Sequence, residues 1–249
     1  MFRRSITPII AVVMMLMMTV MAAGAVFTWY QQFQQQQLQK VTKSAAALAK
    51  NIAFAVNEAR WNNKYGESKE FDTNGDNTND LKVTYVTFQF TITNSGDDMD
   101  LNSKNPLAFA ALSELTTGTP IVQSSPGVLV VDKTNSLNVY PTNLNFANNK
   151  VDLTTPSNEQ VTIVDVGNNA LTNPLVCYRV VTTELNHPIN IVASGETARF
   201  NCMAVIKVET STDGTTWNAV DYSPKGYDAT KDYNIEVHYG AVTQVAQIQ

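Results

Sequence analysis

The residues best suited to chemistry are oxygen-bearing side chains that alternate along one polar stretch: Asp72, Asn74, Asp76 and Asp80. Carboxylate and amide oxygens are the ligands that Ca²⁺ takes, in sets of six to eight. The Gly of this stretch stands at its fourth place rather than its sixth, and the twelfth place is Val83, where an EF-hand has Glu. The stretch therefore favours two interpretations, a weak calcium site or a polar linker.

The two cysteines each lie in an apolar, strand-like context, Cys177 in LVCYRVV and Cys202 in FNCMAVI. In an exported protein, two such residues predict a disulfide. Closing a loop of this length would stabilise the fold by roughly 3–4 kcal/mol in the chain-entropy model. The alternative is two buried thiols that act as small apolar side chains.

The motifs of common enzyme classes are missing from the sequence. His187 and His238 are the two histidines, and neither has a His or Cys partner at metal-ligand spacing. The chain contains no G-x-S-x-G, H-E-x-x-H, P-loop or G-x-G-x-x-G pattern. We therefore expect a protein that is not an enzyme and that holds no cofactor apart from the calcium considered above.

The C-terminal two thirds of the chain has the texture of short strands. KVTYVTFQFTITN (residues 82–94) alternates β-branched or aromatic residues with polar ones, the pattern of a half-buried strand. Similar runs cover residues 127–132, 160–166, 175–183, 197–209 and 233–242. Turn residues separate them, and Asp213-Gly214 predicts a hairpin. Gly96-Asp97-Asp98-Met99-Asp100 is a weaker candidate for calcium than the stretch above and is interpreted as a solvated hairpin tip. This region is therefore expected to be an antiparallel β-sandwich, immunoglobulin-like with insertions.

The charge is low and unevenly distributed. Charged residues make up 16% of the chain and the formal net charge is −5. Residues 1–62 carry a net charge of +5, so the remaining residues carry −10. An acidic outer part without clustered Lys or Arg argues against a nucleic-acid partner.

The N-terminal segment sets the expected class of protein. Arg3 and Arg4 are followed by no charged residue until Lys40, and residues 6–30 form a mostly apolar run. About 20 such residues suffice to cross a bilayer as a helix. One interpretation is a secretory signal cleaved near residues 23–25, and a second is a plain membrane anchor oriented by the two arginines.

A third interpretation arises because the sequence turns amphipathic without interruption. No Gly or Pro occurs between Ala25 and Tyr65, and apolar residues recur at steps near 3.6. One helix over residues 6–62 is therefore expected. The apolar surface of so long a helix must be buried, and we expect the same helix of other subunits to bury it. The residues expected to mediate polymerisation are Ile9, Ile10, Val13, Leu16, Val20, Phe27, Phe33, Val41, Leu48, Ile52 and Val56.

The start of the chain, RRSITPIIAV (residues 3–12), resembles the N-terminus of archaeal type IV prepilins. That family has a short basic leader, a small residue and then an apolar helix that begins with an Ile-Thr-Pro-Ile type of sequence. The resemblance implies cleavage between Ser5 and Ile6 by a prepilin peptidase. It also implies residence in the cytoplasmic membrane before export, and assembly by pilus machinery into an extracellular homopolymer.

Two departures from related families narrow the expectation. Bacterial pilins carry Glu at the fifth mature position, which here is Ile10. Archaellins usually start with Gly-rich, Glu-bearing sequences that this chain lacks. The resemblance therefore favours an adhesion pilus, with an archaellum subunit or a membrane-tethered β-sandwich binding protein as alternatives.

Together these features predict an α+β chain in four parts. Residues 1–5 are the leader peptide, residues 6–62 the long helix, residues 63–81 a polar linker and residues 82–249 the outer β-sandwich.

Overall fold

The computed structural model describes residues 51–127, 129–134, 141, 143–154, 158, 160–224 and 226–249. The chain divides into two compact units, Met1–Ala49 and Lys50–Gln249, and the described residues all belong to the second. The predicted cleavage site at Ser5 and Ile6 and the predicted polymerisation residues from Ile9 to Leu48 lie outside the described residues.

The described residues form strands and contain no helix, so the expected α+β class is wrong for this part of the chain. The first strand, β1 (Phe54–Phe71), takes the place of the end of the predicted helix and continues into residues 63–81. Ile52 and Val56, predicted to mediate polymerisation, belong to the interior instead: Val56 is buried, and Ile52 packs against the main core. No helix among the described residues is long and apolar enough to cross a membrane.

Bulges in β1 explain why its sequence resembles a helix. β1 pairs antiparallel with β2 (Leu81–Asn94), and its register shifts at three places, the first between Asn57 and Arg60. A bulge inserts an extra residue into one strand. The buried side chains of Val56 and Ala59 are therefore three residues apart rather than two. Three-residue spacing is typical of a helix face, but pairing with β2 decides the structure.

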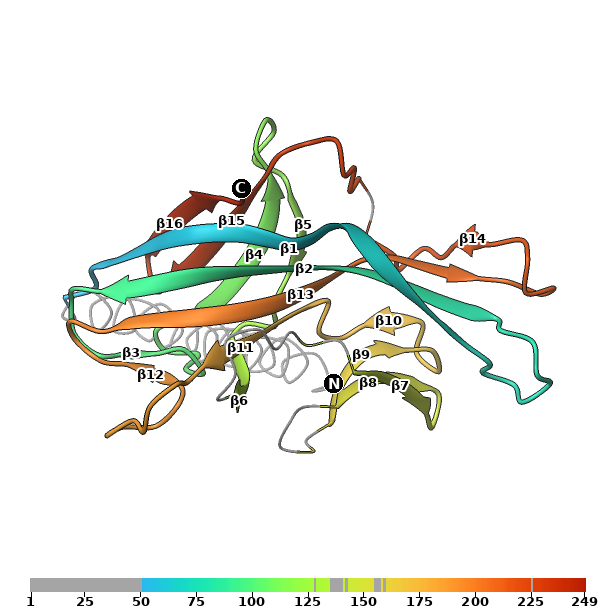
Figure 1. Ribbon diagram of the computed structural model, residues 1–249, viewed down its shortest axis with the longest axis horizontal. Coiled ribbons are helices and arrows are strands. Elements are labelled where there is room, and N and C mark those ends of the chain that lie inside the picture. Colours follow the sequence, from blue (N-terminus) through green and yellow to red (C-terminus); the bar gives the residue numbers. More distant parts are fainter. Residues whose placement is uncertain are drawn as a thin grey trace, which may run out of the picture. The chain divides into compact units, whose positions relative to one another are not determined.

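A central sheet of long strands organises the described unit (Figure 1). Its order is β1-β2-β13-β11-β6, and the short strand β14 pairs with β13. The bounds of the added strands are Val130–Thr134 for β6, Leu175–Val180 for β11, Thr197–Thr210 for β13 and Asn218–Ala219 for β14. β11 and β6 run parallel, whereas the other neighbours in this sheet are antiparallel.

Two four-stranded sheets and one two-stranded sheet complete the described unit. The first has the order β16 (Val242–Gln247), β15 (Tyr233–Tyr239), β4 (Ala108–Glu114) and β5 (Pro120–Gln123). The second has the order β10 (Ala170–Leu171), β9 (Gln160–Asp165), β8 (Lys150–Thr154) and β7 (Leu144–Ala147). A small sheet pairs β12 (Ile191–Val192) with β3 (Met99–Asp100).

The central sheet has a separate apolar core on each face. Phe88 and Phe90 of β2 face the first core, to which the β16-β15-β4-β5 sheet contributes Leu112 and Ile235. Val83 faces the second core, to which the β10-β9-β8-β7 sheet contributes side chains including Leu153. Successive side chains of a strand point to opposite faces, so β2 and β13 are apolar along most of their length. The domain thus has three layers, and the expected two-layer immunoglobulin-like sandwich is corrected.

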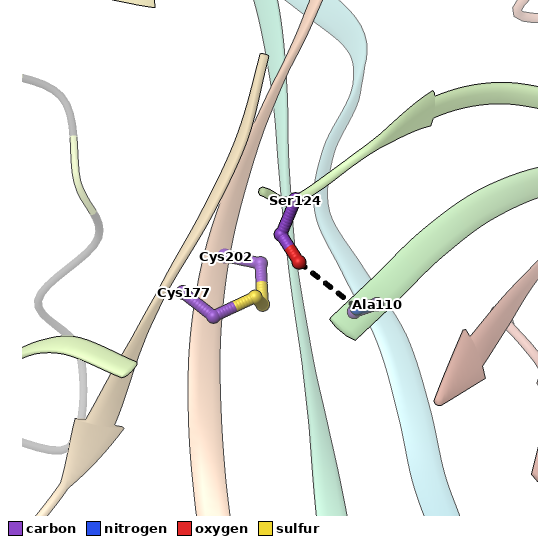
Figure 2. Close-up of a disulfide and its surroundings, with 4 residues drawn as sticks. All are labelled: Ala110, Ser124, Cys177 and Cys202. Carbon is purple, nitrogen blue, oxygen red and sulfur yellow. Dashed lines mark hydrogen bonds between the residues drawn. A yellow bond between two sulfur atoms is a disulfide. The ribbon is translucent and has the colours of Figure 1, made fainter. Parts of the chain in front are cut away.

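A disulfide joins the two central strands β11 and β13 at the pair that the sequence suggests (Figure 2). Cys177 and Cys202 are directly opposite in the antiparallel register, with Cα atoms 4.1 Å apart, and both are fully buried. Beside them, the Ala110 backbone N–H donates to Ser124 Oγ at 2.9 Å. The disulfide lies inside the first core.

The last residues of the chain close the first core along one side. Ile248 is buried, and Gln249 exchanges backbone hydrogen bonds with β1: Trp61 N–H to the Gln249 carbonyl at 2.9 Å, and Gln249 N–H to the Ala59 carbonyl at 3.1 Å. The first bulge of β1 lies beside this contact, so the irregular part of β1 is where the two sheets join.

Candidate functional site

The chain enters the β unit through a set of polar contacts that we call the junction: residues 51–53, the Asn94–Asp98 turn and the 187–196 loop with Arg179. Two backbone bonds tie the entering chain to the turn, from Asp97 N–H to the Asn51 carbonyl and from Ser95 N–H to the Ala53 carbonyl, each 2.8 Å. The Asn51 N–H in turn donates to Asp97 Oδ2 at 3.0 Å. The strand-like pairing thus extends upstream of β1.

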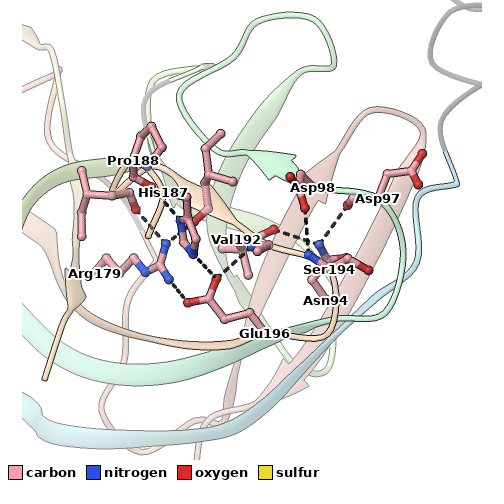
Figure 3. Close-up of polar contacts among 12 residues, drawn as sticks. Asn94, Asp97, Asp98, Arg179, His187, Pro188, Val192, Ser194 and Glu196 are labelled. Carbon is pink, nitrogen blue, oxygen red and sulfur yellow. Dashed lines mark hydrogen bonds and ion pairs between the residues drawn. The ribbon is translucent and has the colours of Figure 1, made fainter. Parts of the chain in front are cut away.

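Asn94 is the buried centre of the junction. Its side-chain NH₂ donates to the carbonyls of Asp97 and Val192, both at 2.9 Å, and its side-chain oxygen accepts the Gly96 N–H at 3.0 Å. These contacts use both amide donors and the acceptor, which satisfies a side chain with no solvent exposure. Figure 3 shows Asn94 linked to Asp97 of the same turn and to Val192 of the facing loop. In the segment predicted to be a solvated tip, Asp97 and Asp98 are exposed, whereas Gly96 and Met99 are buried.

A buried cation holds the far side of the junction. Arg179 on β11 is 2% exposed, and its guanidinium donates to the carbonyls of Ile189, at 2.9 Å, and Ile191 and to the Glu196 carboxylate. Burial lowers the pKa of Arg179, and the adjacent Glu196 carboxylate opposes that shift. Arginine stays protonated under such conditions, so the pair is a charge-assisted contact within the fold.

Glu196 connects Arg179 to the rest of the loop. Its Oε2 accepts the Ala193 N–H at 2.8 Å and lies 3.3 Å from His187 Nε2. His187, predicted to have no metal partner, lines a cleft of about 510 Å³ formed by residues of the 181–189 segment, among them Glu184. Figure 3 shows the Arg179, Glu196 and His187 side chains converging.

The predicted calcium residues lie elsewhere, in the loop that closes the β1–β2 hairpin. Asp72 accepts the backbone N–H groups of Asn74, Gly75 and Asn77, and Asp80 accepts the backbone N–H and hydroxyl of Thr73. Partial desolvation raises the pKa of Asp72, but backbone hydrogen bonds from residues 74–77 outweigh it and lower the pKa.

Within the described residues, no group of three or more His, Cys, Asp or Glu side chains gathers as a metal site would require. Like Asp72 and Asp80, Asp76 accepts a hydrogen bond from within the loop, from the Thr78 N–H at 2.7 Å. Calcium binding stays a prediction from the sequence.

His238 lies on the outer side of β15, remote in sequence from the junction. Its ring stacks on Phe109 with centroids 4.1 Å apart, and its Nδ1 lies 2.9 Å from the Thr243 hydroxyl. Glu236 on the same strand accepts a hydrogen bond of 2.5 Å from the Ser113 hydroxyl. Phe109, Thr243 and Ser113 belong to the strands on either side of β15, and cross-strand contacts of this kind stabilise a sheet face.

Sequence reasoning missed the main residues of the junction. The Asn-Ser-Gly at residues 94–96 signals a turn correctly, but nothing local indicates that residues 51–53 pack against it. Arg179 lies in an apolar strand pattern, which does suggest a buried charge in need of a partner. Glu196 is 17 residues further on, and the sequence alone cannot select it among the acidic residues.

No protein-family model matches the chain, and no curated protein is significantly similar to it.

Proposed function

We propose that the protein is the structural subunit of an extracellular filament of the type IV pilus kind, used for surface attachment. The observation that carries the proposal is the N-terminal segment. Arg3-Arg4 precede an uncharged stretch that extends to Gln39, and its first 25 residues after Ser5 are mostly apolar. A segment of this kind needs lipid before export and other copies of itself afterwards.

Two features of the chain fit an exported filament subunit. A disulfide that is fully buried between central strands suits a protein outside the cytoplasm. The remainder of the chain after residue 62 has a net charge of −10, which would keep the outer surfaces of neighbouring filaments apart.

Assembly would follow cleavage between Ser5 and Ile6 by a prepilin peptidase. The apolar segment would then move from the cytoplasmic membrane into contact with the same segment of other subunits, driven by pilus assembly machinery. Burial of apolar area contributes about 25 cal/mol per Å², so a shared core of such segments would be very stable.

The test is the N-terminus and the assembly state of native protein. Edman sequencing of material sheared from cells should give Ile6 as first residue, and electron microscopy of the same material should show filaments. An intact Met1 on a membrane-bound monomer would indicate a tethered binding protein, and a start near Val26 would indicate a secreted monomer. Either result overturns the proposal.

The adhesion role is separable from motility. Deleting the protein should reduce attachment of cells to surfaces and leave swimming unchanged. Loss of swimming with attachment retained would indicate an archaellum subunit instead.

A further inference from the structure

The loop that closes the β1–β2 hairpin contains the one Asn-Gly pair of the sequence, Asn74-Gly75. Both residues are exposed, and Figure 1 shows the loop at the end of the two paired strands. Because glycine has no side chain, its backbone nitrogen is the least hindered nucleophile that a chain can offer to the side-chain carbonyl of the preceding residue. The pair therefore joins an amide that can be attacked to the nitrogen best able to attack it.

Hydrogen bonds within the loop hold the reacting groups of the pair. Asn74 Oδ1 accepts the Asp76 N–H at 2.9 Å, and this contact closes a ring of atoms that includes the Gly75 backbone nitrogen. Asn74 Nδ2 donates to Asp76 Oδ2 at 3.1 Å, and the Gly75 N–H donates to Asp72 Oδ1 at 2.7 Å. A donor on Oδ1 draws electron density from the side-chain carbonyl, so its carbon, Cγ, is easier to attack.

The base of the loop is fixed, whereas the surroundings of the pair are open. The Asp80 N–H donates to the Phe71 carbonyl and the Ser211 N–H donates to the Asp80 carbonyl, each at 2.9 Å. Apart from the two adjoining residues, no described atom lies within 4 Å of the position of a Cβ at Gly75. Solvent can therefore reach the pair while the loop keeps its shape.

We propose that Asn74 is a site of spontaneous deamidation in the folded protein. The Gly75 backbone nitrogen loses its proton to a solvent base and forms a bond to Asn74 Cγ, and the bond from Cγ to Nδ2 breaks. Nδ2 takes a proton from water and leaves as ammonia, and a cyclic succinimide remains. Water then opens the ring at either carbonyl, which gives aspartate or isoaspartate at position 74. Water is the only co-reactant, and no group is oxidised or reduced.

The reaction changes the charge of the loop and not the interior of the domain. Each modified copy gains a negative charge in a loop that already holds Asp72, Asp76 and Asp80. Neither residue of the pair belongs to the two apolar cores of the described unit. The fold should therefore persist, and the modified fraction should increase with the age of the protein. This inference is independent of the proposed filament function.

The Asp213-Gly214 turn is an internal comparison, because an aspartate can form the same succinimide by losing water from its carboxyl group. Asp213 accepts the backbone N–H groups of Thr216, at 2.7 Å, and Thr215, at 2.9 Å, and these bonds hold the pKa of Asp213 below its usual range. The carboxylate therefore stays ionised near neutral pH, and it is a poorer electrophile than a neutral amide. Asp213 should react much more slowly than Asn74.

The test follows deamidation by peptide mass spectrometry in the full chain, incubated at neutral and at mildly alkaline pH. Replacement of the amide by a carboxyl group changes the mass, and isoaspartyl methyltransferase labels the isoaspartate product. Asn74→Gln removes the site, because its longer side chain would have to close a larger ring. Gly75→Ala keeps the amide and adds a methyl group next to the attacking nitrogen. Asn94-Ser95 is a second internal control, because Asn94 is fully buried.

We expect modification at Asn74 to be at least about tenfold faster than at Asn94, whose reaction requires local opening of the fold. The rate at Asn74 should rise from neutral to alkaline pH, because the attacking nitrogen must lose its proton. Gly75→Ala should slow the reaction by at least about tenfold, because the methyl group hinders the approach of the nitrogen to Cγ. Asn74→Gln should give no product at that position.

Several results would overturn the proposal. An unmodified Asn74 after alkaline incubation would do so, as would equal rates at Asn74 and Asn94. Product that forms only when the chain is unfolded in urea would also overturn it, because the folded loop would then protect the pair. Asn74→Asp reproduces the charge of the aspartate product and should unfold in urea at the wild-type midpoint. A lower midpoint would show that the change reaches the interior of the domain.

Discussion

At the scale of single residues, the Arg179–Glu196 pair illustrates how this domain accommodates charge. A buried guanidinium costs free energy unless its donors find partners. Here two carbonyls and one carboxylate from the 189–196 loop supply them, so the irregular loop is held by a side chain from a regular strand. The charge is thus used to fix a segment that has little strand pairing of its own.

Replacing Glu196 by Gln should therefore be costly. The amide keeps the shape of the side chain but leaves the Arg179 charge without a counter-charge, and we expect a loss of about 2–3 kcal/mol in unfolding free energy. Urea denaturation measures this loss.

The matched control is Asp232→Asn, which removes a carboxylate from the exposed pair that Asp232 forms with Lys64 at 3.4 Å. That substitution should cost less than about 1 kcal/mol. Equal effects of the two substitutions would show that the buried Arg179–Glu196 pair contributes no more to the unfolding free energy than the exposed pair.

At the scale of secondary-structure elements, the C-terminal residues hold two sheets together. Ile248 is 2% exposed, whereas Val245, three residues earlier on the same segment, is 51% exposed. We expect Ile248→Ala to lower the unfolding free energy by about 2–4 kcal/mol, through lost burial and the cavity left behind. Val245→Ala should stay within about 0.5 kcal/mol. Comparable losses for both in urea denaturation would contradict a joining role for the last residues.

Regular strands were predicted well from the sequence. β2, β9, β11, β13 and β15 fall on runs whose alternation or apolar character is clear, and the Asp213-Gly214 hairpin is confirmed by the pairing of β13 with β14. Strands with weaker signals were missed, among them β4, whose AFAALSE sequence has little β-branched character, and β16.

The largest error, a helix across residues 54–62, has a physical cause. Bulges change the spacing of buried residues in β1, and local periodicity cannot distinguish a bulged strand from a helix face. The junction was not predictable for a related reason. Its contacts join residues 51–53, 94–98 and 187–196, which are far apart in the sequence, and a local pattern carries no information about contacts between distant segments.

At the scale of the whole described unit, the central sheet couples the two cores. β2 and β13 contribute side chains to both, so neither core can form without the strands that serve the other. Cooperative unfolding follows from such sharing.

Two matched substitutions test this coupling. Leu112→Ala in the first core and Leu153→Ala in the second each remove a fully buried side chain, and each should lower stability by about 2–4 kcal/mol. Both variants should unfold in one transition, with coincident curves by tryptophan fluorescence and far-ultraviolet circular dichroism in urea. A second transition in Leu153→Ala alone would show that its layer is an independent unit.

The loop that closes the β1–β2 hairpin has a practical consequence. Its carboxylates accept hydrogen bonds from within the loop, and apart from the two adjoining residues no atom lies within 4 Å of the position of a Cβ at Gly75. The composition of this loop is therefore independent of both cores. A foreign peptide grafted beside Gly75 would be displayed by the β1–β2 ribbon, and the proposed filament, if it forms, would carry the graft as a periodic, multivalent array.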